Sequence, residues 1–100
     1  MSSTPEEDLL ADLRNPKFVG AYIAEIIKGD LALMLYQARE DAGLTREQVA
    51  EKAGVTKDYI RKLECGEGNP RISTIGAILA PLGVSLDIHF VPFNKKGGKL

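Results

Sequence analysis

The sequence predicts one small all-α domain of five helices followed by a single C-terminal β-strand. Three observations support this class. Apolar residues recur every three or four positions over most of the chain, helix-capping residues precede these stretches, and strict alternation of apolar and polar residues begins only after residue 83. A chain of 100 residues suits a single domain. We expect a helical extension over residues 1–29, a core domain over 30–83, a strand over 84–93 and a flexible basic tail over 94–100.

The composition is that of an ordinary globular protein. Hydrophobic residues make up 44% and charged residues 27%, which excludes a disordered or collagen-like chain. The longest unbroken apolar stretch, Leu31 to Leu35, is too short to span a membrane, and the acidic start is unlike a secretory signal. We therefore expect a cytoplasmic protein without membrane association. The single cysteine, Cys65, excludes an internal disulfide and a multi-cysteine metal site.

The net charge of −1 hides an uneven distribution. Residues 1–43 carry eight acidic and four basic side chains, whereas residues 73–100 carry one acidic and three basic side chains. This imbalance permits one face to meet phosphate while another stays acidic.

The first two helices are predicted on either side of Gly29. Asn15 is the expected N-cap, with Pro16 in the first helical position. The second helix is expected to begin at Asp30 and to end at Gly43. The apolar face of the first helix consists of Phe18, Tyr22, Ile23, Ile26 and Ile27, and that of the second of Leu31, Met34, Leu35, Ala38 and Ala42. A weaker helical turn is expected over residues 8–13.

The third and fourth helices are predicted to be joined by a tight turn. Thr45 and Gln48 have the spacing of a capping box, and Thr56 is the expected cap of the fourth helix. Gly54 supplies a residue that can adopt positive φ between them. The inward residues are Val49, Ala50 and Ala53 in the third helix and Ile60 and Leu63 in the fourth.

The fifth helix is expected to start at Ser73 and to end at Gly83, with Pro81 tightening or kinking its last turn. Its inward residues are Ile75, Ile78, Leu79 and Leu82. The alternating segment that follows presents Val84, Leu86, Ile88 and Phe90 on one face. Because a lone strand leaves its backbone groups unpaired, we expect it to pair antiparallel with the same strand of a second copy. The sequence thus predicts a homodimer.

Small and apolar residues occupy fixed positions between Arg46 and Leu63. Counted from Arg46, position 5 is Ala50, position 9 is Gly54 and position 15 is Ile60. Ala50 must be small where two helices cross, and Gly54 makes the turn without strain. Ile60 and Leu63 anchor the second helix. This pattern resembles the helix-turn-helix of DNA-binding repressors.

The exposed face of the second helix of this motif is rich in basic residues. With Ile60 and Leu63 inward, a helical wheel places Lys57, Asp58, Arg61, Lys62 and Cys65 at or near the exposed face. Basic side chains there can donate to guanine in a major groove, and Asp58 can accept from cytosine. The helix N-terminus and Thr56 would approach phosphate. The alternative is that this is a solvated face of a small helical bundle.

Residues 31–83 resemble the Cro/C1-type repressor domain of the XRE family, whose fold is lambda-repressor-like. The resemblance rests on the motif above and on Leu63-Glu64-Cys65-Gly66, Asn69-Pro70 and Leu82-Gly83. It implies a buried ion pair between Arg39 and Glu64. It also implies phosphate contacts from Thr45, Arg46 and Arg71, and base contacts from or beside Lys57, Asp58, Arg61 and Lys62. The expected partner is double-stranded operator DNA with two inverted half-sites about 34 Å apart.

The segment before residue 31 is similar to antitoxins of the HigA or addiction-module-antidote type. The similarity rests on Leu13, Asn15-Pro16, Ala21-Tyr22-Ile23 and Gly29-Asp30, together with Gly68-Asn69-Pro70 and the C-terminal strand. It implies a small RelE-like or HigB-like mRNA interferase as toxin partner, autorepression of the operon, and a toxin-binding face that includes Phe18, Tyr22 and Ile26. One alternative is a stand-alone repressor in which the extra helix only covers the core. A second is a protein-interaction module that does not bind DNA.

The hypothesis that this protein is an enzyme finds little support in the sequence. Cys65 and His89 are a conceivable nucleophile and base, but they fall on the exposed end of a helix and on the polar face of the strand. One histidine and one cysteine cannot hold a zinc ion unaided, and no glycine-rich phosphate loop follows a strand. We expect no catalysis, no cofactor and no metal.

Overall fold

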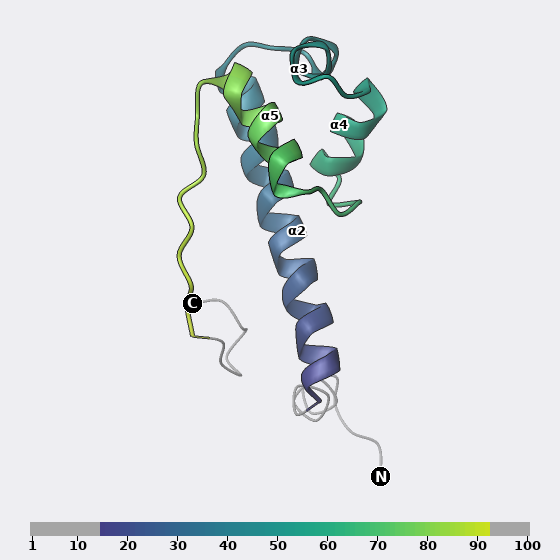
Figure 1. Cartoon of the computed structure of the whole chain (residues 1–100), viewed down its shortest axis with the longest axis vertical. Helices are drawn as coiled ribbons and strands as arrows, with labels where there is room; N and C mark the ends of the chain where they lie inside the picture. The colour runs from purple at the N-terminus through teal and green to yellow at the C-terminus, as the bar shows by residue number, and fades with distance from the viewer. Residues whose placement is uncertain (1–14, 93–100) are drawn as a thin grey trace. The chain divides into compact units, whose positions relative to one another are not determined.

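A computed structural model describes residues 15–92, and all regular structure in this range is helical. Its elements are α2 (Pro16–Asp41), α3 (Arg46–Ala53), α4 (Lys57–Glu64) and α5 (Ile72–Leu82) (Figure 1). The prediction of an all-α fold is therefore confirmed for the described range, although the two separate N-terminal helices are not found. The turn expected over residues 8–13 and the tail over 94–100 lie outside the described residues.

The chain divides into two compact units. One, called the core unit below, comprises residues 27–87 and contains the C-terminal part of α2 with α3, α4 and α5. The other contains the described residues 15–26 and 88–92.

Helix α2 corrects the prediction of two helices separated at Gly29. The amide of Lys17 donates to the side chain of Asn15 at 3.0 Å, as expected of an N-cap, and the helix then runs without interruption to Asp41. A glycine inside a helix costs only about 1 kcal/mol relative to alanine. Ending the helix at Gly29 would leave carbonyl groups without partners, so the helix continues. Helical spacing also placed Met34 inward, but its side chain is 50% exposed.

The C-terminal segment corrects a second prediction. Residues 84–92 form no strand in this single chain, and the side chains of the expected apolar face are exposed, from 39% at Leu86 to 99% at Phe90. A strand is defined by a ladder of backbone hydrogen bonds with a neighbouring strand, and residues 15–92 contain no second strand. Alternation in the sequence indicates a two-faced segment but supplies no partner for its backbone.

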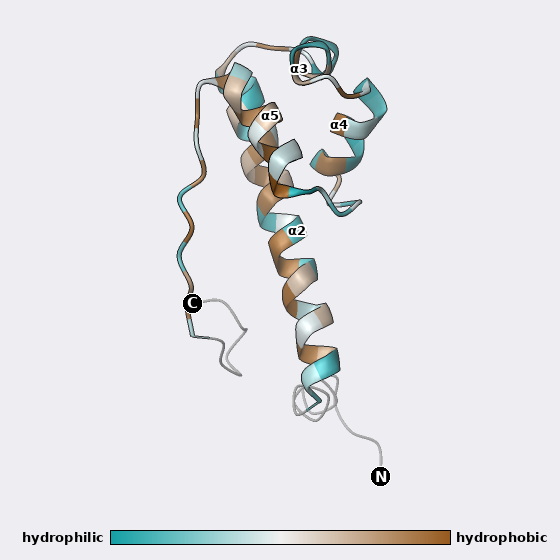
Figure 2. Ribbon diagram, viewed as in Figure 1, coloured by the Kyte–Doolittle hydropathy of each residue, from teal (hydrophilic) through white to brown (hydrophobic). Residues whose placement is uncertain are grey.

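The core unit is built around residues from all four helices. Val49 and Ile60 are fully buried, and Ile78 is 1% exposed. Helix α3 packs against both α4 and α5, and Leu35 of α2 belongs to the same buried cluster as Ile78 and Leu82 of α5. The buried cluster consists of Leu35, Val49, Ala50, Ile60, Leu63, Ile78 and Leu82. Figure 2 shows hydrophobic residues over much of α2 and α5, and more hydrophilic ones on α3 and at the start of α4.

Helix α5 tolerates its internal proline. The helix begins at Ile72 with Arg71 as N-cap, one residue before the position predicted from Ser73. Pro81 lies one residue before the helix ends, so its missing N–H removes a hydrogen bond only from the last turn. Gly83 then adopts positive φ (71°), and its N–H donates to the carbonyl of Ala80 at 3.0 Å. The last turn is thus completed after the proline.

Candidate nucleic-acid interface

The turn between α3 and α4 is built by caps on both helices. The Thr45 hydroxyl accepts from the amide of Gln48 at 3.1 Å, and the Gln48 side chain accepts from the amide of Thr45 at 2.8 Å. Gly54 has φ 75°, a conformation that side chains with a Cβ rarely adopt. The Thr56 hydroxyl then accepts from the amide of Tyr59 at 3.0 Å and starts α4. These contacts fix the angle at which α4 leaves α3.

Helix α4 has one buried face and one exposed face. Ile60 and Leu63 are 0% and 3% exposed, so they hold the helix against the core. On the other side, the side chains of Lys57 and Asp58 are both 61% exposed, as the helical wheel predicted. The side chains of Arg61 and Lys62 are 42% and 50% exposed. The basic side chains of α4 therefore reach solvent, while Ile60 and Leu63 do not.

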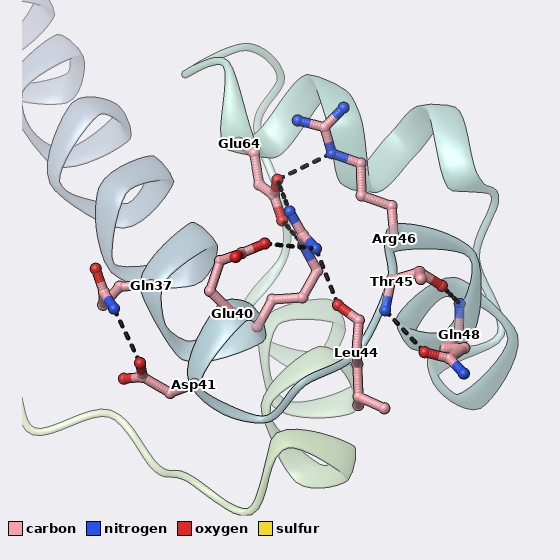
Figure 3. A network of polar contacts seen from close by, with 9 residues as sticks. Gln37, Glu40, Asp41, Leu44, Thr45, Arg46, Gln48 and Glu64 are labelled. Atoms are coloured by element: carbon pink, nitrogen blue, oxygen red, sulfur yellow. Dashed lines mark hydrogen bonds and ion pairs between the residues drawn. The ribbon is translucent and has the colours of Figure 1, made fainter.

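The carboxylate of Glu64, at the end of α4, is bound to two arginines from other helices (Figure 3). Arg39 of α2 donates from Nε to Oε2 at 2.6 Å and from Nη2 to Oε1 at 3.1 Å. Arg46 of α3 donates from Nε to Oε1 at 3.0 Å. The Glu64 side chain is only 1% exposed, so this carboxylate joins α2, α3 and α4 inside the molecule.

Electrostatics keep Glu64 ionised. Burial acts to raise the pKa of its carboxyl, but the hydrogen bonds from Arg39 and Arg46 outweigh burial and lower the pKa. The hydrogen bond to Glu64 raises the pKa of Arg39 correspondingly, against the opposing effect of burial. Arg39 also donates to the carbonyl of Leu44 at 2.9 Å, which ties the network to the loop before α3 (Figure 3). No buried side-chain nitrogen or oxygen within residues 15–92 lacks a hydrogen-bond partner.

Arg46 has a second role that sequence reasoning missed. The family resemblance implied a phosphate contact, and the structure adds the contact with Glu64 inside the protein. Only Nε makes this contact, and the two terminal nitrogens point away from Glu64 (Figure 3). The Arg46 side chain is 34% exposed. Spacing in the sequence gives no sign of a contact between residues 46 and 64, because it depends on how α3 and α4 cross.

The cations of α4 are paired with acidic side chains at the surface. Lys57 Nζ lies 3.1 Å from Glu47 Oε1 of α3. Arg61 Nε lies 2.9 Å from Asp58 Oδ1, and Lys62 Nζ lies 3.6 Å from Asp58 Oδ2. The hydrogen bond from Arg61 lowers the pKa of Asp58 and, reciprocally, raises the pKa of Arg61. The pairs of Asp58 with Arg61 and with Lys62 can be predicted from the sequence, because residues three and four positions apart are neighbours on a helix surface.

The remaining expected contacts lie at the ends of helices. Thr45, Arg46 and Lys57 line one shallow, open depression at the surface. Arg71 is exposed at the N-cap of α5 and makes no side-chain capping bond. Within residues 15–92 there is no cluster of three or more histidine, cysteine or acidic side chains that could hold a metal ion. No helix in that same range is both long and apolar enough to cross a membrane.

Comparison with known proteins agrees with this geometry. The chain is 36% identical over 62 residues to an uncharacterized HTH-type transcriptional regulator of Haemophilus influenzae, covering 62% of this chain and 61% of the relative. It is 38% identical over 47 residues to HTH-type transcriptional regulator y4dJ of Sinorhizobium fredii, covering 47% of this chain and 61% of that protein. It is 35% identical over 48 residues to the immunity repressor protein of Bacillus phage phi105, covering 48% of this chain and 33% of the repressor.

The chain thus spans about three fifths of the first two relatives and one third of the phage protein. A profile of the helix-turn-helix family HTH_3 matches residues 35–89, which include all of α3, α4 and α5 and the end of α2. This match agrees with the two capped helices α3 and α4 and with the glycine turn between them. The chain belongs to the HTH_3 helix-turn-helix family.

Proposed function

We propose that this protein is a sequence-specific transcriptional repressor that inserts α4 into the major groove of operator DNA. The observation that carries the proposal is the two-sided nature of α4. Its apolar side is buried through Ile60 and Leu63, and its opposite side presents cations to solvent. A helix held in this way can enter a groove about 12 Å wide without disturbing its own packing. The two regulators to which the chain is similar support a role in transcriptional regulation, and the phage immunity repressor supports repression.

The side chains of the interface divide into two groups. Arg61 and Lys62, with Asp58 beside them, extend from the exposed face of α4 and would contact base edges. Side chains at helix starts would contact the phosphates that flank the groove, because helix N-termini and exposed guanidinium groups bind anions. This second group consists of Thr45, Arg46, Thr56 and Arg71, whereas Lys57, at the start of α4, belongs with the residues at or beside the base edges.

We further propose that the repressor acts as a homodimer. The exposed segment 84–90 alternates apolar and polar residues, and its apolar side chains at Ile88 and Phe90 are 67% and 99% exposed, so antiparallel pairing with the same segment of a second copy would cover this apolar face. Two-fold symmetry would then present two copies of α4 to half-sites about 34 Å apart. Sedimentation at several concentrations checks this expectation. Phe90→Asp and Ile88→Asp should shift the protein toward monomer, whereas exposed Ile72→Asp should not.

A binding experiment tests the proposed repressor function. The wild-type protein is used to enrich a duplex from a random library, and affinities are measured for that duplex and for a scrambled one. Lys62→Glu should weaken binding to the enriched duplex by about 100-fold or more, because it reverses a charge at the groove. Lys52→Glu makes the same charge change on α3 and should have a much smaller effect. Equal effects of the two substitutions, or no salt-dependent binding by wild type, would contradict the docking of α4.

Antitoxin activity is a second candidate function. It is favoured by exposed apolar side chains on the N-terminal half of α2, where Phe18 is 37% and Ile27 is 59% exposed. Such residues on a long helix suit a partner protein. If a growth-arresting protein is encoded beside this one, co-expression should restore growth. Phe18→Glu should abolish the rescue and leave DNA binding intact, with Glu25→Gln as a control on the same helix. If the neighbouring gene has no toxic effect, the antitoxin function is contradicted and only the repressor function remains.

A further inference from the structure

Each cation on α4 is already paired with a carboxylate before any DNA is present. Lys57 is paired with Glu47, and both Arg61 and Lys62 are paired with Asp58. Asp58 differs from Glu47 in this respect, because its one exposed carboxylate engages two cations through two different oxygens. It lies in the first turn of α4, on the face that would approach DNA.

These pairs are at the surface and exchange easily with solvent. The Asp58 side chain is 61% exposed, and the side chains of its two partners are 42% and 50% exposed. Exposed ion pairs contribute little to stability, since water and salt screen them. A phosphate or a base edge can therefore displace Asp58 from either cation. The carboxylate cannot leave the interface, however, because it is fixed to the same helix.

The consequences differ between the two kinds of DNA site. On DNA of arbitrary sequence, the main attraction comes from phosphates, and a carboxylate beside the two cations both competes with phosphate and repels it. On a matching site, the cations can donate to guanine while Asp58 accepts from the exocyclic amine of cytosine. The carboxylate of Asp58 then accepts a hydrogen bond from cytosine in place of its contacts with Arg61 and Lys62.

We propose that Asp58 is a specificity-determining residue that suppresses binding to non-matching DNA. The inference rests on the proposed DNA-binding function and deepens it. Asp58 masks Arg61 and Lys62 against phosphate alone and releases them at sites that offer a hydrogen-bond donor to its carboxylate. The residue thus improves discrimination by weakening the wrong complexes more than the right one.

The test compares three variants of the full chain with wild type. Asp58→Asn removes the charge, Asp58→Glu keeps a carboxylate three and four residues before the same cations, and Glu51→Gln removes an exposed charge from α3. No described ion pair involves Glu51. The probes are the duplex enriched by the wild-type protein and a scrambled duplex of equal length and composition, each measured at several salt concentrations.

Asp58→Asn should bind the scrambled duplex more tightly by about threefold or more, and the ratio of the two affinities should fall accordingly. For Asp58→Asn, the slope of log affinity against log salt concentration should steepen by about one released ion per bound chain, because the uncovered cations now contact phosphate. Asp58→Glu keeps a negative charge beside the same cations and should therefore not gain affinity for the scrambled duplex, and Glu51→Gln should change the ratio by less than about twofold. Circular dichroism should show equal helix content, with Asp58→Ser as a replacement should the asparagine variant fail to fold.

Several results would overturn the inference. One is an unchanged affinity for the scrambled duplex, because a ratio that falls only through loss of the enriched duplex describes an ordinary base contact. Another is an equal gain in Glu51→Gln, which would indicate general net charge. Failure of the wild-type chain to enrich any duplex would instead contradict the proposed function itself.

Discussion

Replacing Glu64 by glutamine should destabilise the protein strongly while changing almost no volume. The substitution leaves the charge of Arg39 buried opposite a neutral amide, and the Arg39 side chain is only 9% exposed. Removing one partner of a buried ion pair costs about 3–5 kcal/mol. We expect about 3 kcal/mol, at the lower end, because Glu40 lies 3.4 Å from Arg39 and the other partner, Arg46, is 34% exposed.

Urea unfolding followed by circular dichroism measures this difference. The midpoint should fall with an unchanged slope, and the melting temperature should drop by on the order of 15 °C for a domain of this size. Glu40→Gln is the matched control: it removes a carboxylate that is half exposed and also near Arg39. Its effect should stay below about 1 kcal/mol.

The pH dependence gives an independent check. Because the pKa of Glu64 is lowered in the folded protein, its contribution is fully present above the unfolded pKa of about 4.3 and is lost as pH falls through the folded value. The difference in unfolding free energy between wild type and Glu64→Gln should therefore shrink on acidification below about pH 4.3. A difference below about 0.5 kcal/mol at neutral pH, or one that does not shrink in acid, would refute the role given to this carboxylate.

Three further predictions concern the turn and the phosphate contacts. Thr45→Ala should lower the unfolding free energy by about 1 kcal/mol through loss of the cap, and Thr45→Ser should restore most of it in the same urea assay. Gly54→Ala should also cost about 1 kcal/mol, purely through positive φ, since a Cβ there meets no atom within 4 Å. Arg46→Lys should weaken binding to the enriched duplex by about tenfold, nearly as much as Arg46→Ala, because one ammonium group cannot reproduce a guanidinium that serves Glu64 and phosphate together.

The parts of the fold that follow from local chemistry could be predicted from the sequence. The caps at Asn15, Thr45 and Thr56 satisfy backbone donors within three residues, and Gly54 adopts its expected φ without help from distant contacts. Such features depend on residues that are adjacent in the chain, so spacing alone reveals them.

The predictions that failed depend on a balance between two opposing energetic costs or on pairing with a second molecule. Gly29 suits a helix end, yet a glycine inside a helix costs less than a break, which would leave the last four carbonyl groups of one helix and the first four N–H groups of the next without intrahelical partners. The alternating segment 84–90 has the pattern of a strand, but pattern does not provide a hydrogen-bonding partner. The contact between Arg46 and Glu64 was missed for a third reason, because it joins different helices and depends on their crossing angle.

Burial decides which carboxylates of this surface can exchange with DNA. A phosphate can take a cation from a carboxylate only if that carboxylate can be hydrated afterwards. Glu64, at 1% exposure, cannot be hydrated unless α4 leaves the core, so its arginines stay bound and Arg46 has only its terminal nitrogens for phosphate. Asp58, at 61% exposure, is hydrated without any rearrangement. Glu64 therefore keeps the orientation of α4 fixed, while Asp58 adjusts to the DNA sequence that α4 contacts. An exposed carboxylate at position 64 would not hold α4 in place, and a buried one at position 58 could not exchange its cations with DNA.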